Sequence, residues 1–319
     1  MNKKILLIIL GLAVIGAVSL PFYVVRELNH SVSSNHRLTD FVVSDGETTS
    51  AIGSRLVEQK LINSKLSFLV YVYSRNKKIQ SGNYELSADM SEKNLIDTIS
   101  VGQTKTIRVT IPEGWRLEQI AARLEAKKVV KYDDFIQAAK GSEGYLFPDT
   151  YDFRTDLTAA AVARMMTANF DKRTIGSNLA KNDIILASII EREAENDADR
   201  AGIAGVFANR LKINMKLQSD VTVIYQRDNN NYRTGDQSFQ FWQKLASGDI
   251  TRVTGSYSTY QNAGLPPGPI CNPGLKSLEA AQNPAEHGYL YFLYGPKGDI
   301  HYASSQAQQD QNAQKYLGY

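Results

Sequence analysis

Residues 183–195 read Asp-Ile-Ile-Leu-Ala-Ser-Ile-Ile-Glu-Arg-Glu-Ala-Glu, and this stretch decides how the larger part of the chain folds. Its apolar residues cover every side of a helix, which predicts a buried helix rather than an amphipathic surface helix. Two carboxylates, Glu191 and Glu193, follow at its end, where burial raises a carboxyl pKa as a general acid requires. Spacing alone does not choose between them. A solvated last turn without a chemical role is the alternative.

Hydrogen-bonding side chains lie among apolar ones in residues 206–225. Asp220 fits the N-cap of a helix, which is the commonest structural role of such a residue. Asn209 and Arg210 fit a surface pair at the end of another helix. The number of polar groups in this stretch nevertheless favours a functional site over a merely solvated turn.

Tyrosines lie beside a loop rich in proline and glycine, Gly264–Ile270. Proline and glycine at this density fix a rigid loop. Tyr257 and Tyr260 suit a sugar, because tyrosine offers an apolar ring face for stacking and a hydroxyl for hydrogen bonds. A loop with a structural role alone is the alternative.

The composition excludes several classes of protein. The net charge of +3 on 319 residues is small and its basic residues are spread out, so nucleic acid is not an expected partner. The single cysteine and the four histidines are far apart and lack HExxH or CxxC spacing, so we expect no metal site. Neither a phosphate-binding loop nor a nucleophile elbow occurs, and we expect no cofactor.

The N-terminus predicts a single transmembrane helix. Lys3 and Lys4 precede an uncharged run, Ile5–Val25, that crosses ~30 Å of hydrocarbon at about 1.5 Å per residue. Residues 1–4 form a cytoplasmic tail, and the positive-inside rule leaves the rest of the chain outside. A cleaved signal peptide is the alternative, although its apolar region is usually shorter. Residues 26–38 are polar and predict a linker.

A strand, a glycine turn and an amphipathic helix are predicted twice, around Gly46 and again around Gly114. After the first copy, residues 82–86 predict a strand, and Ser91 fits the N-cap of a helix that runs to Ile99. The sequence therefore predicts a small βα module near the N-terminus.

This module, residues 39–104, resembles a LysM module, the small fold that binds glycans containing N-acetylglucosamine. The likeness rests on Gly46-Glu47-Thr48 followed by Ile52. A plain α/β spacer is the alternative.

Residues 105–319 predict one larger mixed α/β domain. Helical patterns cover Leu157–Phe170 and Arg200–Leu211. Aromatic residues alternate in Tyr289–Tyr294 and Ile300–Tyr302 around a glycine- and proline-containing turn, which predicts a hairpin, and a polar helix closes the chain. Together with the anchor and the small module, the predicted fold class is α+β.

Five stretches resemble the endolytic murein transglycosylase family, also called YceG-like. In chain order they are Glu143–Tyr151, Ala187–Glu193, Val206–Leu211, Leu217–Tyr225 and Gly264–Ile270. The order of anchor, LysM-like module and catalytic domain matches as well, so the resemblance covers essentially the whole chain.

The resemblance implies a lyase that breaks the β-1,4 bond between N-acetylmuramic acid and N-acetylglucosamine within a glycan strand and leaves a 1,6-anhydromuramic end. The family's catalytic glutamate is the second Glu of Ile-Ile-Glu-basic-Glu, which is Glu193 here. The implied sugar-binding residues are Gln218, Asp220, Thr222, Tyr225, Tyr257, Tyr260, Asn209 and Glu191.

Two positions depart from the family pattern. Ser258 stands where Asn is common, and Val221 stands where Pro is common. The first departure affects any contact that this side chain makes, and the second removes a rigid turn after Asp220.

The short cytoplasmic tail resembles Gram-negative members of the family, so we expect an inner-membrane protein whose catalytic domain lies in the periplasm. The implied partners are peptidoglycan glycan strands, the bilayer and, at the level of the family, peptidoglycan synthases whose new strands the enzyme ends.

Two competing hypotheses remain. A muramidase that uses water needs a second carboxylate, for which Glu191, Glu195 and Asp220 are candidates. A non-catalytic protein would bind the wall without cutting it.

Overall fold

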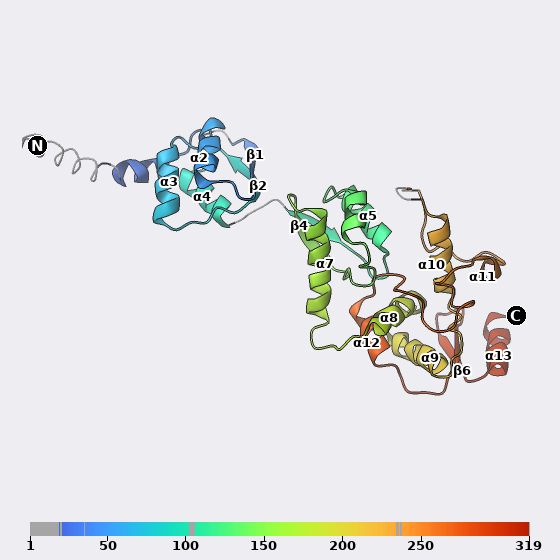
Figure 1. Ribbon diagram of the computed structural model, residues 1–319. Helices are drawn as coiled ribbons and strands as arrows, with labels where there is room; N and C mark the ends of the chain where they lie inside the picture. The colour runs from blue at the N-terminus through green and yellow to red at the C-terminus, as the bar shows by residue number, and fades with distance from the viewer. Residues whose placement is uncertain are drawn as a thin grey trace, which may run out of the picture. The chain divides into compact units, whose positions relative to one another are not determined.

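The computed structural model describes Ser19 and residues 21–34, 36–101, 106–233, 236 and 238–318. The chain divides into two compact units (Figure 1). Unit 1 comprises Met1–Ile107 and Phe153–Asp156, and unit 2 comprises Arg108–Asp152 and Leu157–Tyr319. Helices are mixed with small two-stranded sheets, so the predicted α+β class is confirmed.

Unit 1 is built on one antiparallel strand pair covered by helices. Its elements are β1 (Leu38–Val43), α2 (Thr49–Glu58), α3 (Lys65–Ser74), β2 (Gly82–Ser87) and α4 (Glu92–Val101). The two strands pair from Leu38 with Ser87 to Val43 with Gly82. Because side chains alternate along a strand, Phe41 and Tyr84 point into the core, where they join apolar residues of the three helices.

The two predicted strand–turn–helix copies are confirmed. Gly46 has φ +75° and Gly114 has φ +73°, and glycine tolerates this left-handed conformation without strain. The N-cap at Ser91 is also confirmed, because its hydroxyl accepts a hydrogen bond from the Asn94 N–H at 3.3 Å. The patterns above do not predict α3, whose β-branched and aromatic residues are typical of strands but pack as a helix.

The predicted membrane span lies mostly outside the described residues. Of Ile5–Val25, only Ser19 and residues 21–25 are described, and residues 21–29 are helical. Val24 and Leu28 lie on one side of this helix and are buried in the core of unit 1. The predicted linker 26–38 therefore begins with a packed helical segment rather than a free tether. Among the described residues, no helix has both the length and the apolar character needed to cross a membrane.

The remaining elements follow in chain order. They are β3 (Thr106–Thr110), α5 (Leu117–Ala126), α6 (Tyr132–Ala138), β4 (Thr150–Arg154), α7 (Ala159–Arg173), α8 (Lys181–Glu193), η1 (Asp197–Asp199), α9 (Arg200–Lys212), α10 (Asp220–Asn231), α11 (Asp249–Arg252), α12 (Leu275–Gln282), β5 (Tyr291–Tyr294), β6 (Ile300–Ala303) and α13 (Gln306–Leu317). β3 pairs with β4, and β5 pairs with β6 in an antiparallel hairpin.

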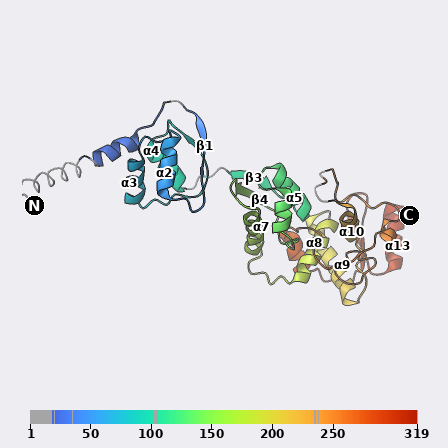
Figure 2. The same ribbon diagram turned by 45° about the horizontal axis from the view of Figure 1, so that its top comes forward.

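Helix α8 forms the centre of unit 2, with α9 and α12 packed against it (Figure 1). Figure 2 shows α9 beside α8 from another direction. Ile184–Ile190 are all buried, so the predicted buried helix is confirmed. The helix ends at Glu193, two residues before the predicted end, because Ala194 has extended backbone angles. The predicted hairpin is confirmed as β5 and β6, and α13 packs against both strands.

Candidate active site

Glu193 lies at the C-terminal end of α8 and opens onto a cavity of about 260 Å³. The cavity collects residues from α8, α9, the start of α10 and strand β5. Besides Glu193 it is lined by Phe207, Arg210, Leu217, Gln218, Ser219, Asp220, Phe292, Leu293 and Tyr294. Apolar and polar side chains, with the carboxylate of Asp220 among them, therefore surround the carboxyl group of Glu193.

The surroundings of Glu193 keep its carboxyl group partly protonated at neutral pH. Burial raises its pKa from an ordinary 4.5 to about 7, and the charge of Asp220 acts in the same direction. A hydrogen bond from the Ser219 hydroxyl, 2.5 Å from Oε1, and the charge of Arg210 lower the pKa in part. A carboxyl group with this pKa can both give and take a proton near neutrality.

Ser219 occupies the N-cap of α10, but its hydroxyl donates to Glu193 instead of capping the helix. Its backbone is held by two threonines. The Ser219 N–H donates to Thr259 Oγ1 at 3.0 Å, and the Thr222 hydroxyl donates to the Ser219 carbonyl at 2.6 Å. The two threonine hydroxyls also share a hydrogen bond of 2.9 Å. This buried network fixes the position from which Ser219 contacts Glu193.

The residues on either side of Ser219 face the cavity. Gln218 has φ +46°, a conformation that costs free energy for a residue with a side chain and is typical of functional sites. Asp220 is exposed and begins α10, and its Oδ1 accepts a hydrogen bond from the Tyr260 hydroxyl at 2.7 Å. The helix cap predicted at Asp220 is therefore one residue late, because Ser219 takes that position.

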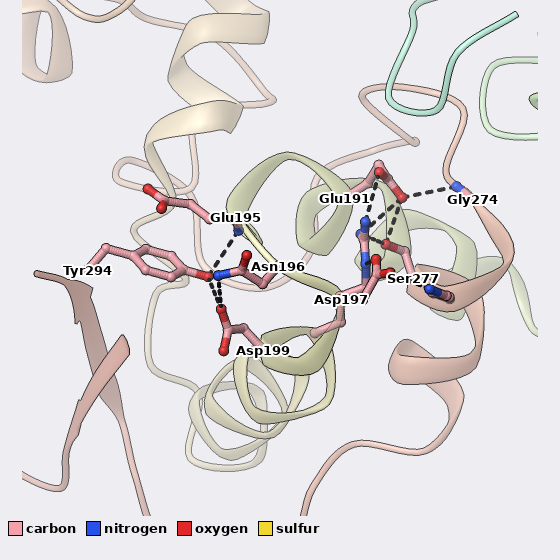
Figure 3. Close-up of polar contacts among 10 residues, drawn as sticks. Glu191, Glu195, Asn196, Asp197, Asp199, Gly274, Ser277 and Tyr294 are labelled. Atoms are coloured by element: carbon pink, nitrogen blue, oxygen red, sulfur yellow. Dashed lines mark hydrogen bonds and ion pairs between the residues drawn. The ribbon is translucent and has the colours of Figure 1, made fainter. Parts of the chain in front are cut away.

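Glu191 points away from this cavity. Its carboxylate pairs with Arg200, whose Nη1 lies 3.1 Å from Oε2, and both side chains are at most 10 % exposed. The same oxygen accepts hydrogen bonds from the Ser277 hydroxyl at 2.7 Å and from the Gly274 N–H at 3.0 Å (Figure 3). Glu191 therefore holds the start of α12 against α8 and α9.

Tyr294 closes the other side of the helix end. Its hydroxyl accepts a hydrogen bond from the Glu195 N–H at 3.0 Å and donates one to Asp199 at 3.1 Å (Figure 3). The ring lines the cavity of Glu193. Glu195 itself is exposed. Of Glu191, Glu193 and Glu195, it alone fits the alternative of a solvated last turn without a chemical role.

The other implied sugar-binding residues lie around the cavity rather than in it. Thr222 is fully buried in the hydroxyl network. Tyr225 is buried, with its ring 4.7 Å from that of Tyr257 and the Arg116 guanidinium 4.1 Å from its centre. Asn209 donates to the carbonyls of His287 at 2.7 Å and Tyr289 at 3.0 Å, so it fastens the segment before β5.

Residues 41–315 match the YceG-like family. This chain belongs to the YceG-like family. It is 33% identical to an endolytic murein transglycosylase of Bacillus subtilis over 86% of this chain and 84% of the relative. It is 28% identical to an endolytic murein transglycosylase of Streptococcus pneumoniae over 92% of this chain, which spans 61% of that longer relative.

A solved structure supports the same family. The crystal structure of a YceG-like protein from Listeria monocytogenes superposes with a TM-score of 0.55 at 30% identity. The match covers 87% of this chain and 99% of the Listeria chain.

The proline- and glycine-rich loop of this YceG-like chain has structural contacts on both sides. The Ile270 N–H donates to the Ser188 hydroxyl of α8 at 3.0 Å. Asn272 lies just after the loop, and its Oδ1 accepts from the Gly144 and Leu146 N–H groups, each at 2.9 Å, which holds this end of the loop against the motif Glu143–Tyr151. Ser258, which departs from the family pattern, is buried, and its Oγ has no hydrogen-bond partner among the described residues.

Sequence reasoning missed several residues that line the cavity of this YceG-like protein. Arg210 is buried and donates to the carbonyls of Leu217 and Leu290, so the surface pair considered for Asn209 and Arg210 is wrong. Ser219 stood within a family motif, beside Asp220, but its hydroxyl gave no separate signal. Phe292 and Tyr294 belong to the alternating aromatic pattern of the hairpin, which predicted a strand and not a wall of the site.

Proposed function

We propose that this protein is an endolytic peptidoglycan lytic transglycosylase, a lyase that cuts the glycan strands of the bacterial cell wall at internal positions. The family membership and the names of the Bacillus and Streptococcus relatives support the activity. The observation that carries the proposal is the single half-buried carboxyl group of Glu193, held by Ser219 in a small cavity with a pKa of about 7.

Glu193 would act first as an acid. It gives its proton to the oxygen that links N-acetylmuramic acid to N-acetylglucosamine, and the bond between that oxygen and the muramic anomeric carbon breaks. The leaving N-acetylglucosamine end gains a hydroxyl group. Positive charge develops on the muramic ring while Glu193 becomes a carboxylate beside it.

Glu193 would then act as a base. The carboxylate takes the proton of the muramic 6-hydroxyl, whose oxygen forms a bond to the anomeric carbon and closes the 1,6-anhydro ring. Glu193 is protonated again, so one group completes the cycle and no water is consumed. A pKa near 7 suits both half-reactions, because neither the acid nor the base form is strongly disfavoured at neutral pH.

We further propose that Gln218, Asp220 and Tyr260 bind the sugar directly. Gln218 and Asp220 line the cavity, and Tyr260 is hydrogen-bonded to Asp220. Four further residues would support the cavity without lining it, since their side chains contact other protein groups: Thr222, Tyr225, Tyr257 and Asn209. Glu191 would keep the end of α8 in place through Arg200.

The location is also a proposal. Ile5–Val25 would anchor the protein in the inner membrane with both units in the periplasm, which the uncharged run after Lys3 and Lys4 supports. Residues 39–104 would act as a LysM-like glycan-binding module, supported by the separate core of unit 1. If the anchor exists, the protein stays in the membrane pellet after alkaline carbonate washing; release into the supernatant would contradict it.

We also propose that the enzyme ends the growth of new strands beside peptidoglycan synthases. Deleting the gene should then lengthen the glycan strands. Unchanged strand lengths would contradict this role without affecting the cleavage activity.

A water-using muramidase is the second candidate, and the position of Asp220 in the cavity of Glu193 favours it. Of the three carboxylates considered as partners for Glu193, Asp220 lines the same cavity, whereas Glu191 is paired with Arg200 and Glu195 is not among the lining residues. An activated water would leave a reducing muramic end instead of an anhydro end.

Mass spectrometry of peptidoglycan digested by the purified full-length chain, beside Glu193→Gln, tests these alternatives. Internal fragments with 1,6-anhydro ends that disappear with Glu193→Gln are the expected result. Reducing ends would identify a muramidase. No products from either folded protein would leave a protein that binds the wall without cutting it.

A further inference from the structure

A second cavity in unit 2 is larger than the one around Glu193 and has no part in the chemistry above. Its volume is about 790 Å³, within the ~300–1,000 Å³ of ordinary ligand sites. One wall is formed by Trp115, α5 and the start of α6, and the other by the segment that follows α10. The two cavities have no lining residue in common.

Aromatic rings dominate both walls. Tyr132 on one wall and Tyr232 on the other share a hydrogen bond of 2.7 Å between their hydroxyls. Phe239 lies 5.3 Å from Tyr232 and 4.9 Å from Phe241, measured between ring centres. Trp115 adds the largest apolar ring. The cavity therefore offers several ring faces held in a defined arrangement.

Three of the charged lining residues have protein partners. Glu118 pairs with the buried Arg116 at 3.2 Å, and Asp236 accepts hydrogen bonds from Ser238. The Arg123 guanidinium lies 4.9 Å from the centre of the Trp115 ring. Three glutamine amides complete the polar lining: Gln119, Gln240 and Gln243. The amides and the aromatic rings suit a neutral ligand that has apolar faces and many hydrogen-bonding groups.

N-acetylhexosamines have these properties, because their C–H faces stack on aromatic rings and their hydroxyl and acetamido groups bond to amides and carboxylates. The cavity of about 260 Å³ at Glu193 holds only a small part of a strand, whereas an enzyme that cuts inside a strand must hold sugars beyond the scissile bond. We propose that the larger cavity is a second glycan-binding site, which holds N-acetylhexosamine units of the strand away from the bond that is cut. This inference rests on the proposed function, since that function supplies the glycan.

The wall of this second site is in contact with the end of α8. The Arg192 guanidinium lies 4.2 Å from the centre of the Trp242 ring, and the Trp242 indole N–H donates to Gln119 Oε1 at 3.1 Å. Gln119 lines the cavity, and Arg192 immediately precedes Glu193. The wall of the second site is thus linked to the end of α8 through Gln119, Trp242 and Arg192.

The chain contains its own reporter for this site. Its two tryptophans are Trp115, which lines the cavity, and Trp242, which bonds to the lining residue Gln119. β-1,4-linked N-acetylglucosamine oligomers would be titrated into the full-length Glu193→Gln chain while tryptophan fluorescence is followed. In a Glu193→Gln/Trp242→Phe chain the signal comes from Trp115 alone. Oligomers bound only by unit 1 leave this emission unchanged.

We expect a saturable change in fluorescence with both chains. Phe239→Ala should weaken the binding at least about tenfold, because it removes a stacking surface. Gln240→Ala, a change at an exposed residue, should weaken it as well and covers the case in which Phe239→Ala fails to fold. Ile175→Ala is the matched control, because this exposed apolar residue of unit 2 is not among the lining residues.

The outcomes separate this inference from the proposed function. If Trp115 emission stays constant while the wild-type chain cuts peptidoglycan, the second site is overturned and the activity stands. If the oligomers bind in the cavity but the wild-type chain cuts nothing, the activity fails and the site remains. A response to free stem peptides but not to sugar oligomers would also overturn the inference, because it would make the cavity a peptide site.

Discussion

Glu191 and Glu193 lie two residues apart at the end of α8, and they face different surroundings. Glu191 contacts a buried guanidinium, a serine hydroxyl and a backbone N–H, which together balance its charge. Glu193 contacts one serine hydroxyl inside a cavity, and its pKa is raised to about 7. Residues two apart on a helix differ by about 200° in direction. One helix end can therefore carry a carboxylate for folding beside one suited to proton transfer.

The largest expected effect is on catalysis at Glu193. Glu193→Gln keeps the shape of the side chain but removes the proton, so the rate of strand cleavage should fall by roughly 10²- to 10⁴-fold. Quantitative release of anhydro-ended fragments measures this rate. Glu279→Gln, a change to an exposed carboxylate on α12, should leave the rate unchanged. Wild-type activity in Glu193→Gln would show that Glu193 does not transfer the proton, and the contrast with Glu191 would then be one of surroundings only.

The next effect is on stability at Glu191. Glu191→Gln leaves the buried Arg200 without its main counter-charge, although Asp197 remains 3.1 Å from it. We expect the free energy of unfolding to fall by roughly 2–3 kcal/mol, somewhat less than is usual when a buried pair loses one partner. Denaturant unfolding measures it, and the rate per folded molecule should change little. Full stability together with lost activity would mean that Glu191, too, takes part in the chemistry.

The pH dependence of stability should also distinguish the two sites. The pKa of Glu193 in the folded protein is raised above its ordinary value, so the protonated group stabilises the fold below pH 4.5, and this stabilisation is lost as the pH rises through 7. Between pH 5 and pH 8 the wild-type chain should lose roughly 2–3 kcal/mol relative to Glu193→Gln. Parallel stability curves for the two proteins would contradict the raised pKa.

Cleavage should follow the same group. Because the protonated carboxyl group starts the reaction, the rate should fall as the pH rises above about 7. The Ser219 hydroxyl favours the carboxylate, so Ser219→Ala should raise the pKa of Glu193 and move this fall to higher pH. A pH–rate profile of the two proteins measures the displacement. A fall at lower pH in the variant would show that Ser219 acts in another way.

The smallest effect is expected at the rim of the cavity. Tyr260→Phe removes one hydrogen bond to the exposed Asp220, so the rate of cleavage should fall by about twofold to tenfold. The pH at which the rate falls should stay close to the wild-type value. A loss as large as that of Glu193→Gln would place Tyr260 in the proton transfer itself.

Local patterns predicted much of the fold. The apolar run of α8, the glycine turns at Gly46 and Gly114 and the hairpin of β5 and β6 depend on residues close in sequence, and each was found where its pattern indicated. The α3 helix was not predicted, because its strand-like composition is overridden by packing in unit 1.

The difference between the two glutamates could not be predicted from local patterns. It depends on partners remote in sequence, Ser277 for Glu191 and Ser219 for Glu193, and periodicity carries no information about such pairs. The roles of Asn209 and Arg210 were hidden for the same reason, since both bond to carbonyls near β5. Family resemblance supplied the preference for Glu193, and the physical contrast emerges only in three dimensions.

The position of Tyr294 in the sequence determines when the cavity around Glu193 can be complete. Its ring lines the cavity of Glu193 and its hydroxyl holds the turn after α8, yet it is made about a hundred residues later than that helix. Until Tyr294 has been synthesised, α8 can form with Glu193 at its end, but one wall of the cavity is missing. A nascent or C-terminally truncated chain therefore carries the glutamate without the finished cavity. The cavity around Glu193 is therefore complete only once β5 has folded against the end of α8.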